Sequence, residues 1–273
     1  MRVWFNGSLL DDPRDSVLRV DDHGITVGDG VFETMKVLDG RPFALTRHLE
    51  RLAASAAGLG LPAPDPEHVR SGVEAVLDGT ALPLGRLRIT YTAGPAPLGS
   101  GRGDGPASLI VVADPMEPAP ESTAILRVPW VRNERGALVG LKTTSYAENV
   151  VALARARESG ASEAIFANTV GNLCEGTGSN IGYVIGGEAR TPSLASGCLA
   201  GVTRALLLEW CDVVEVDEPI GVLDEAEEVF LVSTTRDVQP VHRLDDRGLE
   251  TPGPVTSKLQ ETWAARAAES IDP

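Results

Sequence analysis

The chain contains little lysine, little cysteine and few aromatic residues. Lysine supplies only three of its 24 basic residues, and aromatic side chains make up 4% of the sequence. The three cysteines are odd in number and show no CxxC spacing, so neither a disulfide framework nor a zinc site is predicted. The four histidines form no HExxH or HxH pattern. We therefore expect no metal held by protein ligands.

Positive charge and long apolar runs are also scarce. The formal net charge is -15 and the sequence pI is about 4.7, which opposes binding to nucleic acid because that needs a basic surface. No run approaches the roughly 18 to 20 apolar residues of a membrane span. The first residues lack the apolar core of a signal peptide. These absences predict a cytoplasmic protein with no nucleic-acid or membrane partner.

The chain does have enough apolar residues for a substantial core, with 42% hydrophobic content over 273 residues. An Asn-Gly turn predicts a hairpin over residues 2–10, and Asp39-Gly40 predicts a second turn. Apolar residues recur at helical spacing after Thr46, which is predicted to be an N-cap. Further helices are predicted at 67–77, 145–158, 202–211 and 255–268. Further strands are predicted at 28–38, 85–93, 107–113, 124–128, 163–167, 178–185, 213–216 and 229–233, with an acidic helix or turn at 223–226.

These elements alternate without the regular rhythm of a doubly wound fold. The sequence therefore favours an α/β (α+β) protein with two α/β domains and antiparallel or mixed sheets. Three prolines in Pro115–Pro120 are typical of a linker. We accordingly predict a small N-terminal domain over 1–116 and a larger C-terminal domain over 117–273.

One of the three lysines, Lys142, follows the apolar run Ala137–Leu141 and precedes Thr143-Thr144-Ser145-Tyr146. In a chain that otherwise uses arginine, a lysine in an apolar setting is a candidate for an amine that can lose its proton. Such an amine can form a Schiff base with a carbonyl compound. An ordinary solvated lysine is the alternative interpretation.

Two further segments are candidates for ligand binding. In the hairpin over 173–180, Glu175 precedes two glycines, and small residues there allow a flat ligand to lie against the backbone. The glycine-containing turn 197–201 leads directly into a helix, where free amides and the Thr203 hydroxyl suit a phosphate. Arg51 is a candidate for its charged partner. The alternatives are an acidic strand edge, simple helix capping and an exposed arginine.

Taken together and in order along the chain, these motifs resemble the class IV, fold-type IV pyridoxal-phosphate enzymes. That family includes branched-chain and D-amino-acid aminotransferases and 4-amino-4-deoxychorismate lyase. The resemblance covers nearly the whole chain and rests on five segments: Gly28-Asp29-Gly30-Val31-Phe32-Glu33-Thr34, Lys142 with its Thr143-Thr144-Ser145-Tyr146, Glu175-Gly176-Thr177-Gly178-Ser179-Asn180, Leu199-Ala200-Gly201-Val202-Thr203-Arg204 and Glu227-Glu228-Val229-Phe230-Leu231-Val232-Ser233-Thr234.

The resemblance implies a fold and an assembly. The larger C-terminal domain would carry a mixed, barrel-like sheet, and the two domains would enclose pyridoxal 5'-phosphate at their interface. The relatives are homodimers whose active sites borrow a loop from the partner subunit. The loop Gly94–Gly105 is the candidate for that loop here.

The resemblance also implies a role for each motif residue. Lys142 would hold the cofactor as a Schiff base and shuttle the proton between the substrate Cα and the C4' carbon of the cofactor. Glu175 would keep the pyridine nitrogen protonated. Tyr146 would hydrogen-bond the phenolic oxygen of the cofactor. The phosphate would be bound by Arg51, the amides of Val202 and Thr203, and Thr234.

Substrate residues are less marked in the sequence. Phe32 matches a position that lines the pocket in relatives, and Lys36 and Arg88 match positions that often contact substrate. Either cation could instead be solvated. The D-amino-acid enzymes carry a Thr-Arg-Gly segment, whereas this chain has Thr92-Ala93-Gly94. The missing guanidinium argues against that carboxylate trap.

We therefore predict an aminotransferase that moves an amino group between an amino acid or amine and a 2-oxo acid. A 4-amino-4-deoxychorismate lyase, which releases pyruvate and 4-aminobenzoate, is the alternative, and a non-catalytic binder of the cofactor or a metabolite is a remote one.

Overall fold

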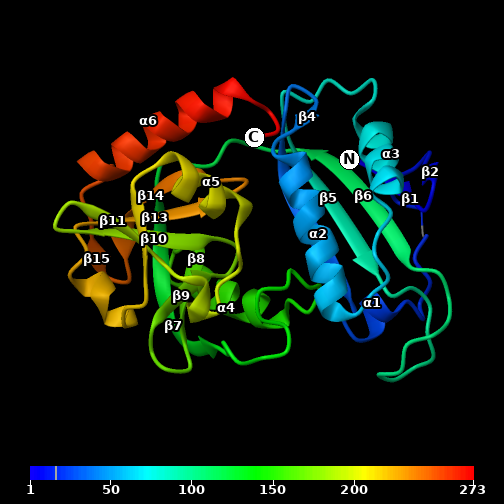
Figure 1. The fold of residues 1–273 in the computed structure, drawn as a ribbon, viewed down its shortest axis with the longest axis horizontal. Coiled ribbons are helices and arrows are strands. Elements are labelled where there is room, and N and C mark those ends of the chain that lie inside the picture. Colours follow the sequence, from blue (N-terminus) through cyan, green and yellow to red (C-terminus); the bar gives the residue numbers. More distant parts are fainter. Residues whose placement is uncertain (16) are drawn as a thin grey trace. The chain divides into compact units, whose positions relative to one another are not determined.

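The computed structural model describes residues 1–15 and 17–273, and these divide into two compact units (Figure 1). The first unit comprises Met1–Pro118, Leu141–Tyr146 and Ile271–Pro273. The second comprises Ala119–Gly140 and Ala147–Ser270. The sequence-based ranges 1–116 and 117–273 assign the segments 141–146 and 271–273 differently, and those ranges stay predictions.

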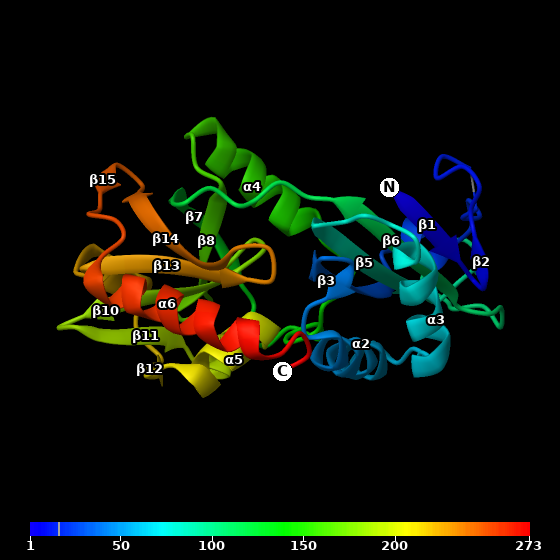
Figure 2. The same cartoon turned by 90° about the horizontal axis from the view of Figure 1, so that it is seen from above.

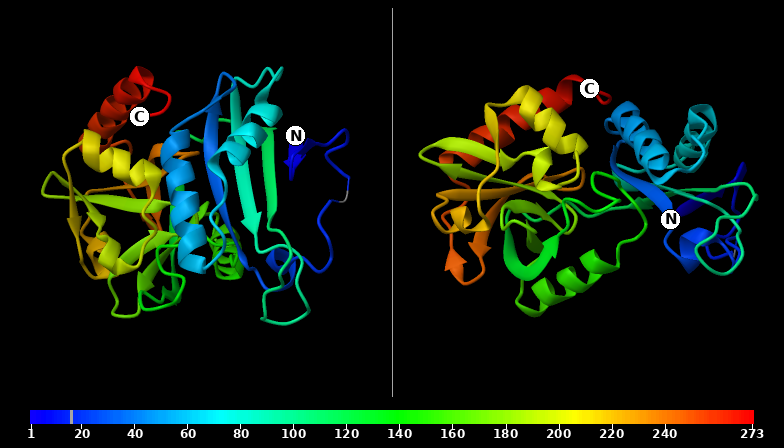
Figure 3. Two further views of the ribbon diagram at one scale, coloured as in Figure 1. Left: turned by 45° about the vertical axis from the view of Figure 1, so that its right-hand side comes forward. Right: turned by 60° about the horizontal axis from the view of Figure 1, so that its bottom comes forward.

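The first unit is built on a six-stranded antiparallel sheet with the order β2-β1-β6-β5-β3-β4. Its strands are β1 (Arg2–Phe5), β2 (Ser8–Leu9), β3 (Gly30–Leu38), β4 (Arg41–Pro42), β5 (Leu84–Thr92) and β6 (Ser108–Pro115), and its helices are α1 (His23–Thr26), α2 (Leu45–Leu59) and α3 (Pro66–Leu77). Both predicted hairpin turns are present. Figures 2 and 3 show α2 and α3 along the same face of this sheet.

Apolar side chains of α2 and α3 pack on that face of the sheet to form the core of the first unit. Leu52 and Val73 contribute from the two helices, and Met35 and Ile89 from the central strands, all at most 3% exposed. Burial of such side chains stabilises a fold by roughly 1.5 to 3 kcal/mol each. The core therefore fixes α2 against β3, which carries several of the predicted site residues.

The start of α2 differs from the prediction. Thr46 is not the N-cap, because the helix begins at Leu45 and the capping position is Ala44 in the left-handed region, with no side-chain cap. Thr46 instead donates from its backbone N and its Oγ1 to the carboxylate of Asp272, at 2.9 and 2.6 Å. A residue near the C-terminus thus provides the acceptor that a local cap normally provides. Gly60, with φ 74°, ends the helix.

The second unit contains a nine-stranded mixed sheet with the order β12-β11-β10-β13-β14-β7-β8-β9, and β15 pairs with β14. Three of its pairings are parallel, namely β11 with β12, β14 with β7, and β7 with β8. The strands are β7 (Thr123–Arg132), β8 (Glu163–Asn168), β9 (Leu173–Gly176), β10 (Asn180–Ile185), β11 (Glu188–Pro192), β12 (Val213–Val216), β13 (Glu228–Ser233), β14 (Asp237–Leu244) and β15 (Arg247–Gly248). The predicted mixed, barrel-like character of the sheet is confirmed.

Helices pack on this sheet from different sides (Figure 2). They are α4 (Ala147–Glu158), α5 (Val202–Trp210) and α6 (Pro254–Glu269), with short 3-10 turns η1 (Leu194–Ser196) and η2 (Ile220–Asp224). Ala152 and Ala156 of α4 are fully buried against β7 and β8. The carboxylate of Glu228 accepts from the backbone N of Val255 and Thr256 and so caps α6. None of the helices in the described part of the chain has the length and apolar character that crossing a bilayer requires.

Three strands of the second unit were not predicted, namely the two-residue strand β15 and the longer strands β11 and β14. β11 follows a turn in which Gly186 and Gly187 both have positive φ, and such a turn favours a tight hairpin. β14 contains Pro240, which pairs with Phe230 of β13 and which ordinarily argues against a strand. For β11 and β14, pairing with a neighbouring strand stabilises a strand that the local sequence does not predict.

Replacing Gly182 by alanine is expected to destabilise the second unit. Gly182 lies opposite Phe230 in the β10–β13 pair, and an added methyl group would lie 2.2 Å from Cζ of that fully buried ring. Overpacking of this kind costs about 1 to 3 kcal/mol, which a urea unfolding curve measures. Gly221→Ala is the matched control, because its methyl group would meet no described atom within 4 Å. Equal midpoints for the two variants would contradict the packing seen here.

Candidate active site

Lys142 is fixed at the edge of the sheet of the first unit by its backbone. Its carbonyl accepts from the N–H of Phe32 at 2.9 Å, and its own N–H donates to Oγ of Ser55 on α2 at 3.1 Å. The next residues continue along β3, where Thr143 bridges Val31. Because β4 pairs only with the far end of β3, this edge is available to the segment 141–146. The lysine is thus held between a strand and a helix.

The side chain of Lys142 lies beside two predicted site residues. Its Nζ is 4.1 Å from the ring centroid of Phe32 and 5.9 Å from that of Tyr146. The two rings pack edge to face with centroids 5.3 Å apart. The guanidinium carbon of Arg88, on the neighbouring strand β5, lies 3.9 Å from the Phe32 centroid. Four of the predicted residues therefore form one cluster around a buried phenylalanine, in which two cations approach the same ring.

Lys36 shares the strand but not the cluster. Phe32, Thr34 and Lys36 lie on the same face of β3, because side chains alternate between the two faces of a strand. Nζ of Lys36 is 5.8 Å from the ring centroid of Phe43. It is 9% exposed, so it is not the solvated lysine of the alternative interpretation. Arg88 is exposed and donates from Nε to Oγ1 of Thr90 at 3.1 Å.

Arg51 binds a buried carboxylate on the other face of β3. Glu33 accepts from Nε and a terminal nitrogen of Arg51 at 2.8 and 2.7 Å, and from Nδ1 of His48 at 2.7 Å. Burial alone would raise the pKa of Glu33, but the charge and hydrogen bonds of Arg51 and the bond from His48 lower that pKa from 4.5 to about 2. Two nitrogens of the Arg51 guanidinium are thus bonded to Glu33, and these bonds fix the orientation of the guanidinium.

His48 completes this cluster through Nδ1 of its buried ring. Burial lowers the pKa of His48 despite the bond to Glu33, and the charge of Lys142 acts in the same direction. Its Nε2 is buried and has no hydrogen-bond partner among residues 1–15 and 17–273. The contact between Glu33 and His48 was not predicted from the sequence. The only signal was the presence of Glu33 in the segment Gly28–Thr34.

In the second unit, Glu175 is anchored to the loop that leads into α5. It lies on β9, and one carboxylate oxygen accepts from the N–H of Leu199 at 2.9 Å. The other oxygen pairs with Nε of Arg132 at 3.3 Å. The guanidinium of Arg132 also lies 4.2 Å from the ring centroid of Phe166, the residue paired with Glu175 across β8 and β9. Arg132 was not predicted, because no motif marks it.

The glycine-rich turn after Glu175 is fixed by a second buried acid. Glu163 accepts from the Thr177 hydroxyl, from the N–H of Gly178 at 3.0 Å and from the Ser179 hydroxyl at 3.1 Å. Its carboxylate is also 3.3 Å from Arg236. The shape of the turn is therefore fixed by bonds to a side chain of the neighbouring strand β8.

The predicted phosphate residues Val202 and Thr203 are the first two residues of α5. Their amides have no acceptor within the helix, and the N-cap Gly201 provides no side chain. Gly201 lies so close to Oδ1 of Asn180 that a methyl group there would be 2.0 Å away. Thr203 is therefore not the N-cap that the alternative interpretation proposed.

Thr234 follows the end of β13 at the same edge as this helix start. Val232 pairs with Asn180, and Nδ2 of Asn180 donates to the carbonyl of Leu199 at 2.9 Å. Next to Thr234, the Ser233 hydroxyl is buried and finds no partner among the described residues. In the second unit, Glu175, the start of α5 and the end of β13 thus converge, and an uncompensated hydroxyl lies beside them.

The segment Thr92-Ala93-Gly94 has a structural role. Oγ1 of Thr92 donates to Oδ2 of Asp22 at 3.1 Å and accepts from the N–H of Gly94 at 3.2 Å. Neither contact involves a side chain of the predicted site.

One family of known proteins matches most of this chain. The model of the family described as amino-transferase class IV matches residues 30–244. A Methanocaldococcus jannaschii protein described as a branched-chain-amino-acid aminotransferase is 30% identical, covering 96% of this chain and 95% of its own. The bifunctional aminodeoxychorismate lyase / D-amino acid transaminase of Mycobacterium tuberculosis is also 30% identical, covering 91% and 93%.

Comparison with solved structures leads to the same family. A solved structure described as a hypothetical aminotransferase from Mycobacterium tuberculosis in its PLP-bound form superposes with a TM-score of 0.85 at 28% identity, covering 97% of this chain and 98% of that one. The fold is that of a two-domain, fold-type IV enzyme. The chain belongs to the class IV aminotransferase family.

Proposed function

We propose that this chain is a pyridoxal-phosphate-dependent aminotransferase that moves an amino group between an amino acid or amine and a 2-oxo acid, with Lys142 as its catalytic residue. The observation that carries the proposal is the placement of Lys142. Its backbone is bonded on both sides, to Phe32 and Ser55, while Nζ projects beside two aromatic rings. Membership of the family supports the reaction type.

The residues present fit the cofactor. A phosphate suits the uncapped amides at the start of α5, since a helix N-terminus carries a partial positive charge. The buried Ser233 hydroxyl without a partner supports a ligand next to Thr234. We assign the phosphate to Arg51, Val202, Thr203 and Thr234, the ring nitrogen to Glu175 and the phenolic oxygen to Tyr146.

The chemistry divides between the cofactor and the chain. Pyridoxal phosphate, when bound, supplies the electron sink that stabilises negative charge at the substrate Cα. Lys142 holds the cofactor through Nζ and, once displaced by substrate, takes the proton from the substrate Cα. Glu175 accepts a hydrogen bond from the ring nitrogen and so holds a proton there. The bond from Leu199 and the ion pair with Arg132 keep that carboxylate in one orientation.

The substrate contacts are assigned to Phe32, Arg88 and Lys36. The guanidinium of Arg88 lies 3.9 Å from the centroid of the Phe32 ring, which Lys142 also contacts, and its positive charge attracts an anionic group such as a carboxylate. An arginine can bind a carboxylate with two hydrogen bonds. Lys36 lies further along the same strand face and is assigned to the distal part of the substrate.

The proposal is tested by following the two half-reactions separately. Holoprotein mixed with a panel of amino donors and no acceptor is expected to lose its visible cofactor absorbance, because the amino group stays on the cofactor. Addition of a 2-oxo acid is expected to restore the absorbance and release a new amino acid. If cofactor-loaded protein neither bleaches nor forms product with any donor and acceptor, an aminotransferase is excluded.

The lyase remains the second candidate, since the Mycobacterium tuberculosis relative is described as catalysing both reactions. Both begin with removal of the same proton by a lysine and differ in where the electrons go. Incubation with aminodeoxychorismate is expected to leave pyruvate and 4-aminobenzoate undetected. Their formation without any transamination would favour the lyase, and inactivity in both assays would favour a binding protein.

We also propose that the enzyme is a cytoplasmic homodimer, as its resemblance to the family and its composition suggest. The loop Gly94–Gly105 is assigned to the partner's active site in that dimer. Light scattering on the purified protein is expected to give twice the 28.7 kDa of the chain.

A further inference from the structure

The loop Gly94–Gly105 is tied at its start to the segment before α1. The N–H of His23 donates to the carbonyl of Gly94 at 2.9 Å, and the N–H of Ala96 donates to the carbonyl of Asp21 at 3.0 Å. These backbone bonds fix the first residues of the loop. They do not explain how its remainder is held, since the loop contains no helix or strand.

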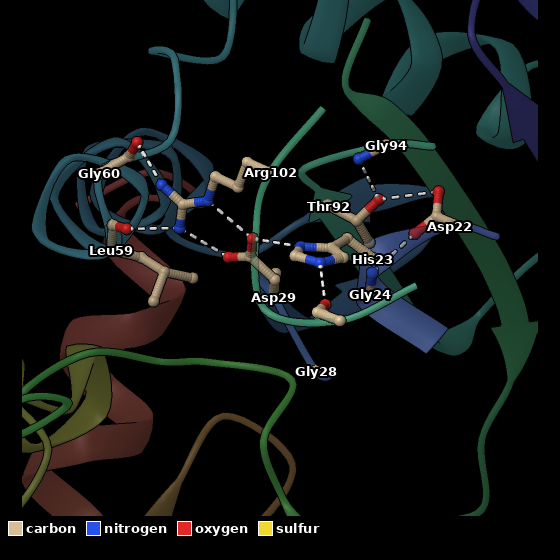
Figure 4. Close-up of polar contacts among 12 residues, drawn as sticks. Asp22, His23, Gly24, Gly28, Asp29, Leu59, Gly60, Thr92, Gly94 and Arg102 are labelled. Atoms are coloured by element: carbon tan, nitrogen blue, oxygen red, sulfur yellow. Dashed lines mark hydrogen bonds and ion pairs between the residues drawn. The ribbon is translucent and has the colours of Figure 1, made fainter. Parts of the chain in front are cut away.

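The far part of the loop is held by Arg102. Its Nε and one terminal nitrogen donate to the two carboxylate oxygens of Asp29, both at 2.7 Å. Its terminal nitrogens also donate to the carbonyls of Leu59 and Gly60, each at 2.7 Å (Figure 4). One side chain thus connects the loop to the residue before β3 and to the end of α2.

The middle of the loop is held by the imidazole of His23, which is 1% exposed. Nδ1 is 2.9 Å from Oδ2 of Asp29, and Nε2 is 2.9 Å from the carbonyl oxygen of Gly99 (Figure 4). A carbonyl oxygen can only accept a hydrogen bond. Asp29 can also only accept, because the bonds from Arg102 lower the pKa of its carboxyl. Both ring nitrogens therefore face acceptors.

A neutral imidazole has only one N–H. Its other nitrogen would then point a lone pair at the acceptor oxygen of Asp29 or of Gly99, which is unfavourable. We infer that His23 is a buried imidazolium, and that His23 and Arg102 are positioning residues that hold the Gly94–Gly105 loop in place. When His23 loses its proton from Nε2, its Nδ1–H still donates to Asp29. The hydrogen bond to the Gly99 carbonyl is then lost, and the middle of the loop is released. Leu98, next to that contact, is 84% exposed.

The neighbouring acid Asp22 does not compete for the ring. Its carboxylate accepts from the N–H of Gly24 at 2.8 Å, from Thr92 at 3.1 Å and from Ser108 at 2.7 Å. The charged groups that face His23 are therefore Asp29, which favours the imidazolium, and Arg102, which opposes it.

The direction of the pH dependence follows from these contacts. The bonds to Asp29 and to the Gly99 carbonyl raise the pKa of His23 above 6.5, its ordinary value. The stabilisation of the loop is thus fully present below that ordinary value and is lost as the pH rises through the raised pKa. Only the loop is expected to respond, since none of these contacts lies in the cores of the two units.

The test uses the holoprotein without substrate, so its outcome does not depend on which reaction the enzyme catalyses. Ring nitrogen NMR is expected to show His23 with both nitrogens protonated at pH 6.5. Hydrogen exchange of the non-proline backbone amides within 95–105, corrected for intrinsic rates, is expected to accelerate about tenfold on deprotonation of His23, which is the effect of losing one charge-assisted hydrogen bond. A neutral His23 at pH 6.5 with a protected loop would overturn the inference.

Variants separate the two positioning residues. His23→Gln is expected to accelerate exchange over 95–105 about tenfold at pH 6.5 and to abolish its dependence on pH. Arg102→Gln is expected to accelerate it while His23 still titrates. His242→Gln, at an exposed histidine bonded to Ser122, is the control and leaves the loop unchanged. Should either loop variant match the control, the assignment is wrong; if both fail to fold, the wild-type NMR titration decides.

Discussion

Replacing Lys142 by alanine is expected to lower kcat for transamination by at least about 10⁴-fold, because removing a general base alone costs 10²- to 10⁴-fold and a covalent anchor is lost as well. The variant is also expected to lack the visible absorbance of the covalently held cofactor. Both quantities are measured with cofactor at saturation, so that weaker binding does not account for the loss.

The control for this variant is Lys258→Ala. Lys258 is exposed on α6, and its removal leaves rate and absorbance unchanged. A small primary amine added to the Lys142→Ala protein is expected to restore part of the proton transfer without restoring the wild-type absorbance. A variant that keeps its colour and its rate would show that another group performs this chemistry.

The sequence predicted the secondary structure correctly for elements that bury a regularly spaced apolar face. The helices over 67–77, 202–211 and 255–268 lie within two residues of α3, α5 and α6, because their apolar spacing matches the face that they bury. The start of α2 did not follow, since its cap is the carboxylate of Asp272 at the other end of the chain. No pattern around Thr46 contains that information.

In the candidate site too, features set by local sequence were predicted, and contacts between distant residues were not. The scarcity of lysine and an apolar setting marked Lys142, and resemblance to a family added Phe32 and Tyr146. The structure places these three side chains together. The bonds of Glu33 to His48 and Arg51 span 15 and 18 residues. Such pairs depend on how α2 packs on β3, which a single sequence does not specify. Hydrophobic periodicity indicates which face is buried but not which polar groups meet within it.

The last of the expected effects concerns that buried acid. Glu33→Gln is expected to lower the free energy of unfolding at pH 7 by about 3 kcal/mol, because it removes the buried negative charge to which Arg51, only 14% exposed, is bonded. Urea unfolding of wild type and variant at matched pH measures the difference. Glu50→Gln, at an exposed position of the same helix, is the control and stays within about 0.5 kcal/mol.

The pH dependence of this difference distinguishes a charge effect from a packing effect. Since the pKa of Glu33 falls from 4.5 to about 2 in the folded chain, its contribution is present above pH 4.5 and is lost as the pH falls towards 2. A pKa difference of that size corresponds to about 3 kcal/mol. Wild type and Glu33→Gln are therefore expected to differ most near pH 7 and to converge in acid. A gap that stays constant from pH 7 to pH 3 would mean that Glu33 contributes through its shape and not through its charge, and that the direction of Arg51 does not depend on an ionised partner.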